Sequence, residues 1–589
     1  MCGIIGMLKR QESEETLREA AQALKRLEYR GYDSWGYAFL NGGKVEMEKR
    51  IGRISIPNIH SKARVAVLHT RWATHGGVTE ENAHPHLDCT GRIAVVHNGI
   101  IENYLDLKEQ LIQRKHLFKS QTDSEVVAHL LEETEGSLYE RAKQIAPRLK
   151  GSFALVIMDA SSTSELVAIK NESPLCMGIG EDRIVFASDP LAFLDYTSKV
   201  IYLEEGELGY ARQNNGNFEL RFFDIAQQKE IQKQPITLPW KNVDNELKEY
   251  PHYMLKEIFE QPKALLAGMD LESAQTMADA LKGRRVVVVA CGTARHAGVI
   301  GKHILHRIAK FPVDVIMAHE ASYFMQDLDP DTVLLAISQS GETADVMECV
   351  RKAKARGIQV YSIVNVPSST LARESKYVFY INCGPEIAVA STKAFTNQIL
   401  AFYLLAYIMA GKREEVKKQL IDVSKLLAQY LPYLDQKARE VALSIKNKKH
   451  VYMLGRGVNF PIALEGALKM KEISYIHAEG MPAGELKHGT LALVEKGTPV
   501  ILLAPSDYTY EDSISNGMET KARGAMLIGI SDKAHPSFSI WTELPKLENP
   551  IFYPLFETAA LQLIAYHTAV TLGRDVDKPR NLAKSVTVK

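Results

Sequence analysis

The stretch RRVVVVACG at residues 284–292 decides the fold of the second half of the chain, because its pattern returns as KKHVYMLG at residues 448–455. In both places two basic residues precede a short apolar strand that ends at or near a glycine. The register holds further along, with offsets of 164, 168 and 167 residues for the pairs Arg285 and Lys449, Ser338 and Ser506, and Gly357 and Gly524. A period this constant predicts two repeated α/β domains of one type.

The pattern of apolar residues differs on the two sides of a polar segment. Before residue 227, short apolar strands at 64–68, 93–96 and 153–157 alternate with turns and a few helical stretches, which predicts an α+β fold with antiparallel strands. After residue 250, apolar strands alternate with long amphipathic helices, which predicts doubly wound parallel sheets. The predicted parts are a first domain at 2–226, a linker at 227–250, α/β domains at 251–425 and 426–576, and a C-terminal tail at 577–589.

The composition is that of a globular enzyme with no excess of either charge. The 589 residues include 71 basic and 71 acidic side chains, so the formal net charge is zero. This balance argues against a protein that binds nucleic acid or an anionic membrane surface. The longest apolar run, residues 399–411, is about half as long as a membrane span. We therefore expect a cytoplasmic enzyme with small-molecule partners, no nucleic acid and no membrane.

The cysteines and histidines show no metal pattern in the sequence. Six cysteines are scattered along the chain, without the paired spacing of zinc ligands or of a disulfide framework. Five histidines occur within one region, but their spacing fits no standard ligand set: His69, His75, His84, His86 and His97. We expect neither a metal site nor a cofactor.

Cys2 directly follows the initiator methionine. Removal of Met1 leaves a thiol and an α-amine on one residue, and an α-amine titrates near ~8. Such a residue can act as nucleophile and base together. The alternative is a structural cysteine at the start of a strand.

Three further segments bear on this choice. Residues 69–76 end an apolar strand in a polar loop, where Arg71 can hold a carboxylate with two hydrogen bonds. Residues 97–99 follow another strand and offer an amide side chain and a glycine N–H to an oxyanion. Asp123 can pair with a substrate ammonium. The alternatives are a hairpin turn for residues 98–99 and a helix N-cap for Asp123.

Taken together, residues 2–6, 29–34, 71–72 and 98–103 resemble the N-terminal-nucleophile glutamine amidotransferases. The resemblance implies a sandwich fold in which a cysteine attacks the glutamine side-chain amide and releases ammonia. Trp35 departs from that family, which has a small residue at this position. The roles implied are nucleophile for Cys2, oxyanion hole for Asn98 and Gly99, and glutamine binding for Arg71, Thr74, His75 and Asp123.

In the second half, residues 338–343 follow an apolar strand and open a helix. Small hydroxyl residues and a glycine at a helix N-terminus form an anion cradle, and the carboxyl end of a strand in an open α/β sheet is where ligands bind. The alternative is an ordinary N-cap with a flexible turn. The second copy, residues 506–511, has acids and aromatics instead, so we expect only the first copy to bind an anion.

A charged face lies on the helix that follows residue 461. Glu465, Lys469 and Glu472 fall at i, i+4 and i+7, with apolar residues on both sides. A solvated salt bridge is the usual meaning of such a pattern, but the apolar neighbours favour a packed cleft. His488 lies downstream on a Gly-flanked loop. Glu472 and His488 suit proton transfers on a sugar.

Over its whole length the chain resembles the glutamine–fructose-6-phosphate aminotransferase (isomerising) family, in which a glutaminase is fused to two sugar isomerase (SIS) domains. The resemblance is based on residues 338–343, 390–396, 472–475 and the tail. Ala294 and Lys589 depart from the family, which has serine and glutamate there. The substrates implied are glutamine and fructose 6-phosphate, the product is glucosamine 6-phosphate, and the assembly is a homodimer.

The resemblance also implies roles for individual residues. Lys584 forms a Schiff base with the open-chain ketose, His488 assists ring opening, Glu472 moves a proton between C2 and C1, and Lys469 is its charge partner. Trp72 gates an ammonia passage. The sugar phosphate is bound by Thr293, Ser338, Gln339, Ser340, Thr343, Val389 and Ser391.

Two other functions are open to such a chain. A sugar-phosphate-sensing regulatory protein built on SIS domains needs the 338–343 loop but neither Cys2 nor Lys584. A glutaminase joined to a phosphoribosyl or asparagine-forming domain needs a pyrophosphate-binding motif, and none follows the linker.

Overall fold

The computed structural model describes residues 2–57, 59–73, 75–238, 247, 249–367 and 369–587. These fall into two compact units. Unit 1 covers the chain up to Asp244 together with residues from Ser585 onward, and unit 2 covers Asn245–Lys584. Each unit is described by itself.

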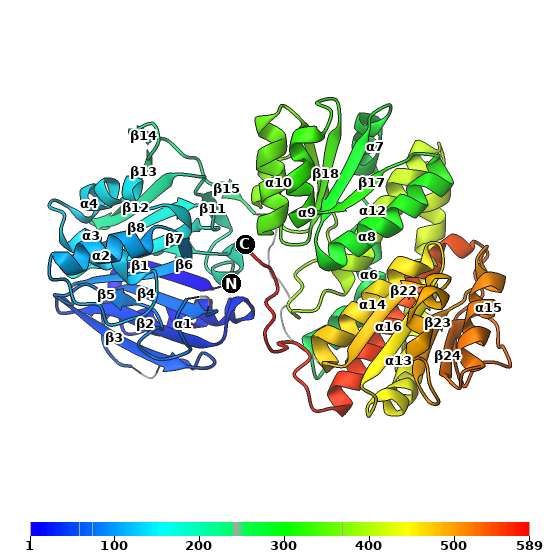
Figure 1. The fold of residues 1–589 in the computed structure, drawn as a ribbon. Coiled ribbons are helices and arrows are strands. Elements are labelled where there is room, and N and C mark those ends of the chain that lie inside the picture. Colours follow the sequence, from blue (N-terminus) through cyan, green and yellow to red (C-terminus); the bar gives the residue numbers. More distant parts are fainter. Residues whose placement is uncertain are drawn as a thin grey trace. The chain divides into compact units, whose positions relative to one another are not determined.

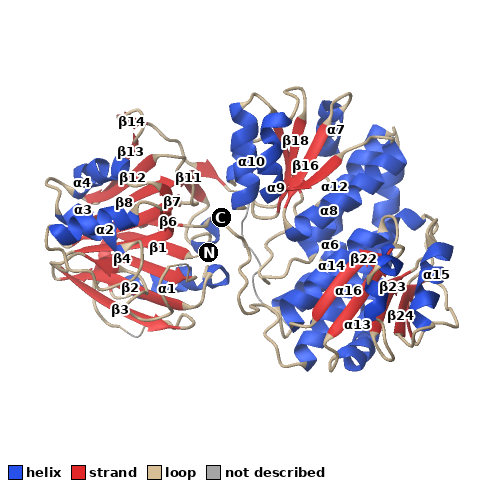
Figure 2. Ribbon diagram, in the orientation of Figure 1, coloured by secondary structure: helices blue, strands red, loops and turns tan. Residues whose placement is uncertain are grey.

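Unit 1 contains two antiparallel sheets (Figures 1 and 2). The eight-stranded sheet has the order β15-β11-β9-β10-β1-β4-β2-β3, and the seven-stranded sheet the order β14-β13-β12-β8-β7-β6-β5. The strands are β1 (Gly3–Ser13), β2 (Ser34–Asn41), β3 (Lys44–Ile51), β4 (Ala63–Arg71), β5 (His86–Leu87), β6 (Ile93–Ile101), β7 (Gly151–Asp159), β8 (Ser162–Asn171), β9 (Cys176–Ile179), β10 (Arg183–Ala187), β11 (Lys199–Tyr202), β12 (Glu207–Asn214), β13 (Asn217–Asp224), β14 (Lys229–Ile231) and β15 (Ile236–Thr237).

The two sheets of unit 1 pack face to face. Alternating apolar residues of β1 and β4, such as Ile4 and Val67, meet Val96 and Val156 of β6 and β7 in one buried cluster. Helix α1 (Thr16–Lys25) covers the outer face of the larger sheet. The outer face of the smaller sheet is covered by α2 (Tyr104–Gln113), α3 (Glu125–Glu132) and α4 (Leu138–Ile145). The four layers confirm the predicted α+β sandwich.

Trp35, the departure in this half, is a core residue. It is buried on β2 and packs on Tyr37 with ring centroids 6.0 Å apart. Its neighbour Gly36 leaves no room for a side chain, because a Cβ there would lie 2.3 Å from the carbonyl oxygen of His84. The large side chain at position 35 packs in the apolar cluster between α1 and the eight-stranded sheet.

Unit 2 contains two five-stranded parallel sheets with the same topology, β17-β16-β18-β19-β20 and β22-β21-β23-β24-β25. The repeated stretches form the first strand of each, β16 and β21, so the predicted internal repeat is confirmed. The strands are β16 (Val286–Ala290), β17 (Asp314–Met317), β18 (Val333–Ser338), β19 (Gln359–Val364), β20 (Tyr377–Tyr380), β21 (His450–Gly455), β22 (His477–Pro482), β23 (Pro499–Leu503), β24 (Met526–Ser531) and β25 (Ile540–Glu543).

Helices join the two sheets of unit 2 into one body with a continuous apolar core. Helices α8 and α12 pack on each other, as do α14 and α16, and α8 also contacts α14. The helices are α5 (Tyr253–Phe259), α6 (Gln261–Ala267), α7 (Leu271–Leu281), α8 (Gly292–Ile304), α9 (Ala318–Phe324), α10 (Ala344–Ala355), α11 (Thr370–Glu374), α12 (Lys393–Met409), α13 (Arg413–Ile445), α14 (Asn459–Ser474), α15 (Tyr510–Lys521) and α16 (Tyr553–Thr571).

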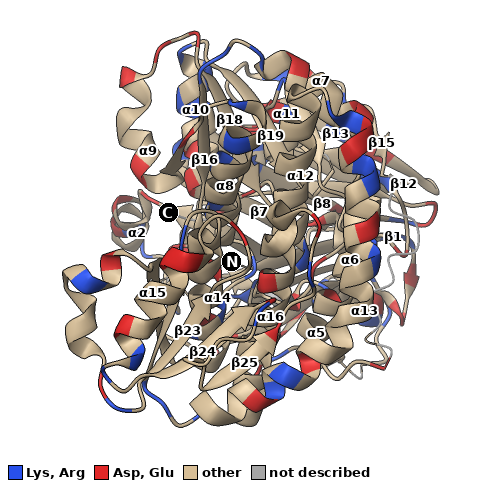
Figure 3. Ribbon diagram, turned by 90° about the vertical axis from the view of Figure 1, so that its right-hand side faces the viewer, with Lys and Arg blue, Asp and Glu red and all other residues tan. Residues whose placement is uncertain are grey.

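The apolar run at 399–411 belongs to this core. Residues 393–408 of α12 are all buried among neighbouring helices. Within the described part of the chain, no helix combines the length and apolarity needed to cross a bilayer. Basic and acidic side chains are interspersed along the ribbon rather than separated by sign (Figure 3).

Three segments differ in detail from what the sequence suggests. The predicted linker contains two short strands, β14 and β15, which pair at sheet edges; short polar strands are typical of edges and look like linker in a sequence. Helix α13 runs through residue 425, where we place a domain boundary. The described part of the tail, residues 577–587, has no helix or strand but is tied to unit 2 by hydrogen bonds, described below.

Candidate active site

Cys2 lies at the start of β1, a central strand of its sheet. Its Sγ accepts the N–H of Trp72 at 3.1 Å and lies 3.6 Å from the carbonyl oxygen of the same residue. Burial raises the pKa of the thiol, and the Trp72 N–H and the Arg71 guanidinium act in the opposite direction. The thiol is therefore held at the end of β4, beside the polar loop.

The side-chain amide of Asn98 is hydrogen-bonded to Cys2. Its Nδ2 donates to the carbonyl oxygen of Cys2 at 2.8 Å. Its Oδ1 lies 3.1 Å from Nε2 of His69, a buried side chain on β4 that fixes which way the amide points. This orienting role of His69 is absent from the sequence analysis, because only the fold brings β4 beside the amide.

Asn98 and Gly99 lie within β6 and pair with β7, so the hairpin-turn alternative is wrong. Gly99 has φ of +111°, and a Cβ there would lie 1.9 Å from the carbonyl oxygen of Ser152. Only glycine fits that position. Gly99 directly follows Asn98, whose amide is bonded to Cys2, and an amide side chain and a backbone N–H are the groups that can stabilise an oxyanion.

The loop after β4 is folded around Arg71. The guanidinium of this buried residue donates to the carbonyl oxygens of Gly77 at 2.9 Å and Gly76 at 3.2 Å, and also to that of His75. Thr74, predicted to bind glutamine, lies outside the described residues. Asp33, which the analysis did not single out, accepts the N–H of Ala73 at 3.0 Å and so helps to shape the loop.

Asp123 precedes α3 but does not cap it. Its carboxylate accepts the N–H of Ile101, at the end of β6, at 2.8 Å. The residue before the helix is Ser124, which makes no side-chain cap bond, so the N-cap alternative for Asp123 is wrong. The buried carboxylate is thereby attached to the strand that carries Asn98 and Gly99.

In unit 2, helix α14 carries a buried row of charges. The ammonium of Lys469 lies 3.3 Å from Glu465 and 2.5 Å from Glu472. Only 1% and 2% of the Lys469 and Glu465 side chains are exposed, so the solvated-face alternative is wrong. Burial raises the pKa of Glu472 although Lys469 opposes it. Burial also acts to raise the pKa of Glu465, but Lys469 and His296 hold it below its usual range.

Residues of the first α/β half complete this cluster. Thr293, on α8, donates to Glu465 at 3.0 Å and accepts from Lys469 at 3.1 Å. His296, one turn further on, lies 2.8 Å from Glu465 through Nδ1. No pattern in the sequence marks His296, or indicates that Glu465 has partners on α8, because the two helices are far apart along the chain. The contacts of Thr293 and His296 with Glu465 and Lys469 join α8 of the first α/β domain to α14 of the second.

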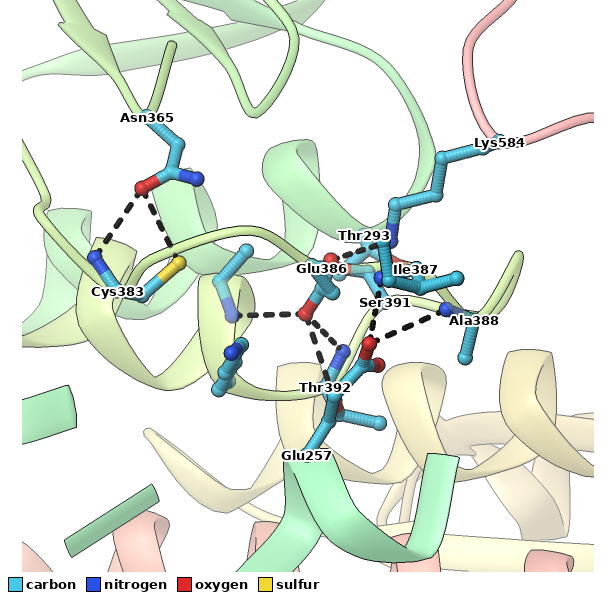
Figure 4. Close-up of polar contacts among 12 residues, drawn as sticks. Glu257, Thr293, Asn365, Cys383, Glu386, Ile387, Ala388, Ser391, Thr392 and Lys584 are labelled. Carbon is cyan, nitrogen blue, oxygen red and sulfur yellow. Dashed lines mark hydrogen bonds and ion pairs between the residues drawn. The ribbon is translucent and has the colours of Figure 1, made fainter. Parts of the chain in front are cut away.

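The tail brings Lys584 to a buried carboxylate, Glu386 (Figure 4). The Lys584 ammonium bonds to Oε2 of Glu386, which also accepts from Ser391 Oγ at 2.9 Å. Its other oxygen accepts the N–H of Thr392 at 2.8 Å and of Ala394 at 2.9 Å. Burial opposes ionisation, but Lys584 and these donors lower the pKa of Glu386 to about 2.

Further bonds fix the course of the tail. The Val389 N–H donates to the carbonyl oxygen of Asp577 at 2.9 Å. The Asp577 carboxylate accepts the N–H groups of Tyr253 and Met254, at the start of α5, at 2.9 and 2.8 Å. The Lys584 ammonium opposes the burial that raises the pKa of Glu472, and the Arg580 N–H of the tail donates to the hydroxyl of Tyr475, the residue after α14, at 2.8 Å. The tail lysine and the α14 cluster therefore belong to one region.

The loop from Ser338 to Thr343 joins β18 to α10 in a tight turn. Ser338 Oγ lies 2.9 Å from Thr343 Oγ1 and accepts the Gly341 N–H at 3.0 Å. Gly341 has φ of +68°, and a Cβ there would meet the hydroxyl of Ser369 at 2.0 Å. The Gln339 carbonyl oxygen accepts the Asn365 N–H at 3.2 Å. The turn, which also contains Ser340, gathers hydroxyl and N–H groups at a helix N-terminus, as an anion site requires.

The second copy of this turn is built differently. The Asp507 carboxylate accepts both the N–H and the hydroxyl of Thr509 at 2.7 Å, and Asn459 donates to its other oxygen at 3.0 Å. The second turn therefore contains a carboxylate that is bonded to its own N–H and hydroxyl groups, which agrees with the expected divergence.

His488 stands apart from the other predicted residues. It ends a short 3-10 helix, Glu485–His488, and its side chain is exposed. Among the described residues, no hydrogen bond or ion pair joins it to Glu472, Lys469 or Lys584. Within one chain the structure does not bring His488 to the cluster.

Comparisons with known proteins agree with this architecture. A model of the SIS domain matches residues 281–408 and 444–572, and a model of a glutamine amidotransferase domain matches residues 69–195. A crystallised C-terminal domain of glucosamine-fructose-6-phosphate aminotransferase from Francisella tularensis is 38% identical, with a TM-score of 0.53, and covers 57% of this chain and all of that one.

Two full-length relatives carry one name, glutamine–fructose-6-phosphate aminotransferase (isomerising). The protein from Thermococcus kodakarensis is 42% identical over 612 aligned residues, and that from Aquifex aeolicus 43% over 606. Each alignment covers all of both chains. These similarities favour an enzyme over the sensor alternative, and the chain belongs to the glutamine–fructose-6-phosphate aminotransferase (isomerising) family.

Proposed function

The chain transfers the amide nitrogen of glutamine to fructose 6-phosphate and isomerises the product to glucosamine 6-phosphate, and we propose that the residues described above carry out the separate steps of this reaction. The observation that carries the proposal is the buried contact of Lys584 with Glu386, in the same region as Glu472 and its Lys469 partner. Ketose imine chemistry needs a primary amine, which Lys584 supplies, and the proton transfer that follows needs a carboxyl group, for which Glu472 with its raised pKa is suited.

In the glutaminase step, the Cys2 thiolate attacks the side-chain amide carbon of glutamine. Asn98 Nδ2 and the Gly99 N–H stabilise the oxyanion that forms. The carbon–nitrogen bond then breaks, the protonated Cys2 α-amine supplies a proton to the nitrogen, and ammonia departs. A glutamyl thioester remains on Cys2, and water hydrolyses it to glutamate. Arg71 and Asp123 bind the glutamine carboxylate and ammonium, with His75 and Thr74 of the same loop as further contacts.

In the synthase step, the turn from Ser338 to Thr343 binds the sugar phosphate, with Thr293, Val389 and Ser391 at its border. The Lys584 ammonium passes one proton to Glu386 Oε2, and its free Nζ attacks C2 of the open-chain ketose. The C2 oxygen then takes up protons and leaves as water, which gives an imine. Ammonia displaces the lysine at C2. Glu472 then takes a proton from C1 while the imine nitrogen gains a proton, which gives an enamine between C1 and C2. Glu472 returns its proton to C2, and the C1 hydroxyl loses the proton that balances the one gained by nitrogen, so that C1 becomes an aldehyde and C2 carries the amine.

We also propose that the enzyme is a cytoplasmic homodimer and that Trp72 gates the passage of ammonia. The exposed position of His488 supports the dimer, because a second copy packed over that loop can bring this histidine to a substrate for ring opening. The Trp72 ring is half-buried and packs edge-on against Tyr32, 5.9 Å away. Light scattering of the purified chain tests the dimer.

The proposed function is tested by one assay with two nitrogen donors. Glucosamine 6-phosphate is measured from fructose 6-phosphate with glutamine, and separately with ammonia. We expect product with both donors. Product with neither, in a preparation that binds fructose 6-phosphate, would support the sensor alternative instead.

A further inference from the structure

A cluster of four metal-ligating side chains lies in unit 1, outside the proposed glutamine site. Cys89 follows β5, His116 follows α2, and His129 and Glu132 lie on α3. One atom of each, Sγ, Nδ1, Nδ1 and Oε2, lies within 4.8 Å of the other three. From this arrangement we infer that these four residues bind one Zn²⁺ ion.

Four of the six distances between the donor atoms are close to those of a tetrahedral zinc site, and the other two are within 4.8 Å. Bond lengths of about 2.3 Å to sulfur and about 2.0–2.2 Å to nitrogen and oxygen give edges of about 3.6 Å for S···N and about 3.4 Å for N···O. The Cys89 Sγ lies 3.5 Å from Nδ1 of both histidines. The Glu132 Oε2 lies 3.1 Å from His116 Nδ1 and 3.3 Å from His129 Nδ1.

The second ring nitrogen of each histidine faces a further carboxylate. His116 Nε2 lies 3.3 Å from Glu133 Oε1, and His129 Nε2 lies 3.6 Å from Glu125 Oε1. Histidines that bind zinc commonly direct the other ring N–H to a carboxylate, which fixes the ring and its tautomer. Glu125 is itself held by the N–H groups of Lys119 and Ser120 at 2.8 and 2.7 Å.

The ligand types favour zinc over other ions. One thiolate and two imidazoles exclude Mg²⁺ and Ca²⁺, which take oxygen ligands, and a carboxylate completes a four-coordinate set. Four protein ligands leave no open position, so the site is structural. Cys89 is exposed, which gives the ion a path from solvent. The sequence spacing does not indicate this site, and the proposal departs from our expectation of no metal.

A zinc ion here would tie two loops to α3. Asp123, which we propose to bind the glutamine ammonium, lies two residues before that helix. The ion would therefore stabilise the part of unit 1 that holds Asp123 in place, without taking part in either reaction.

The test uses the full-length chain without an affinity tag, since histidine tags bind zinc. Zinc per chain is measured by mass spectrometry after dialysis, and Co²⁺ is added to the chelated protein to look for a thiolate-to-cobalt charge-transfer band. We expect stoichiometric zinc and a strong band, both lost in Cys89→Ser and His129→Gln. His319→Gln is the matched control, because His319, with Cys291 and Asp345, forms the other such group among the described residues.

A second measurement covers variants that fail to fold. Cys89 in the unaltered protein should resist alkylation until a chelator is added, as followed by peptide mass mapping. A wild-type chain without zinc and without a cobalt band overturns the proposal. So does zinc that persists in Cys89→Ser or disappears in His319→Gln, and so does Cys89 alkylation that is indifferent to the chelator.

Discussion

The ammonium of Lys584 and the carboxylate of Glu386 form an ion pair almost closed to solvent, with 4% and 0% of the two side chains exposed. The lysine comes from the tail, which forms no helix or strand over residues 577–587, and the glutamate comes from the loop before α12. A charge pair in such surroundings is costly to bury unless its hydrogen bonds are complete. Here Ser391, Thr392 and Ala394 supply them.

This pair leads to a trapping prediction for Lys584. Borohydride added with fructose 6-phosphate should reduce an imine and leave a hexose phosphate on the C-terminal peptide. Lys584→Arg keeps the charge beside Glu386 but cannot form the imine, so it should give no adduct. Lys578→Ala, in the same tail, is the control. Peptide mass mapping that places the adduct on another lysine would rule out the role of Lys584.

Cys2→Ala should separate the two halves of the reaction. In the proposed mechanism, glutamine-dependent synthesis requires the thiol, whereas ammonia-dependent synthesis and the conversion of fructose 6-phosphate to glucose 6-phosphate depend on unit 2. We expect the first to disappear and the other two to persist in the same preparation. Retained synthesis from glutamine would remove Cys2 from the mechanism.

Asn98→Ala should lower the glutaminase kcat by about 10²–10³-fold, the usual effect of losing one oxyanion donor. The KM for glutamine should change little, because the amide acts on the transition state. Asn217→Ala, at an exposed hairpin, serves as the control. Glutamate release measured over a range of glutamine concentrations separates kcat from KM, and an effect confined to KM would contradict the assignment.

The buried carboxyl of Glu257 should make stability depend on pH. Burial, together with the nearby Glu386, raises its pKa to about 8, while an unfolded glutamate titrates near ~4.3. Between these values the folded chain binds more protons than the unfolded chain, so the free energy of unfolding falls as pH rises. Glu257→Gln removes this contribution.

We therefore expect the melting temperature of Glu257→Gln, relative to the unaltered protein, to rise between pH 5 and pH 8. Calorimetry at several pH values measures this difference. Glu260→Gln is the matched control, because that side chain is about one-third exposed. A difference that does not change with pH would show that Glu257 is ionised in the folded protein.

The fold was largely predictable, because its signals are local and repeated. The similar offsets of 164 residues between Arg285 and Lys449 and of 168 residues between Ser338 and Ser506 predicted the two parallel sheets. The edge strands β14 and β15 were not predictable, since three and two residues carry too little hydrophobic pattern.

Parts of the site were beyond prediction for a different reason. Glu386 lies in a loop with no periodicity, and only the fold brings it to a lysine 198 residues away. His69 and His296 act through neighbours on other elements. The Cys89 cluster draws its ligands from a turn, a loop and a helix, so no fixed spacing marks it in the sequence.

The central claim is that this one chain moves nitrogen from glutamine to a sugar phosphate. Glutamine labelled with ¹⁵N in the side-chain amide, supplied with fructose 6-phosphate, tests it most directly. We expect glucosamine 6-phosphate that carries the label, formed in equal amount with glutamate. Glutamate that accumulates without labelled amino sugar, in a preparation that makes the product from ammonia, would contradict the claim.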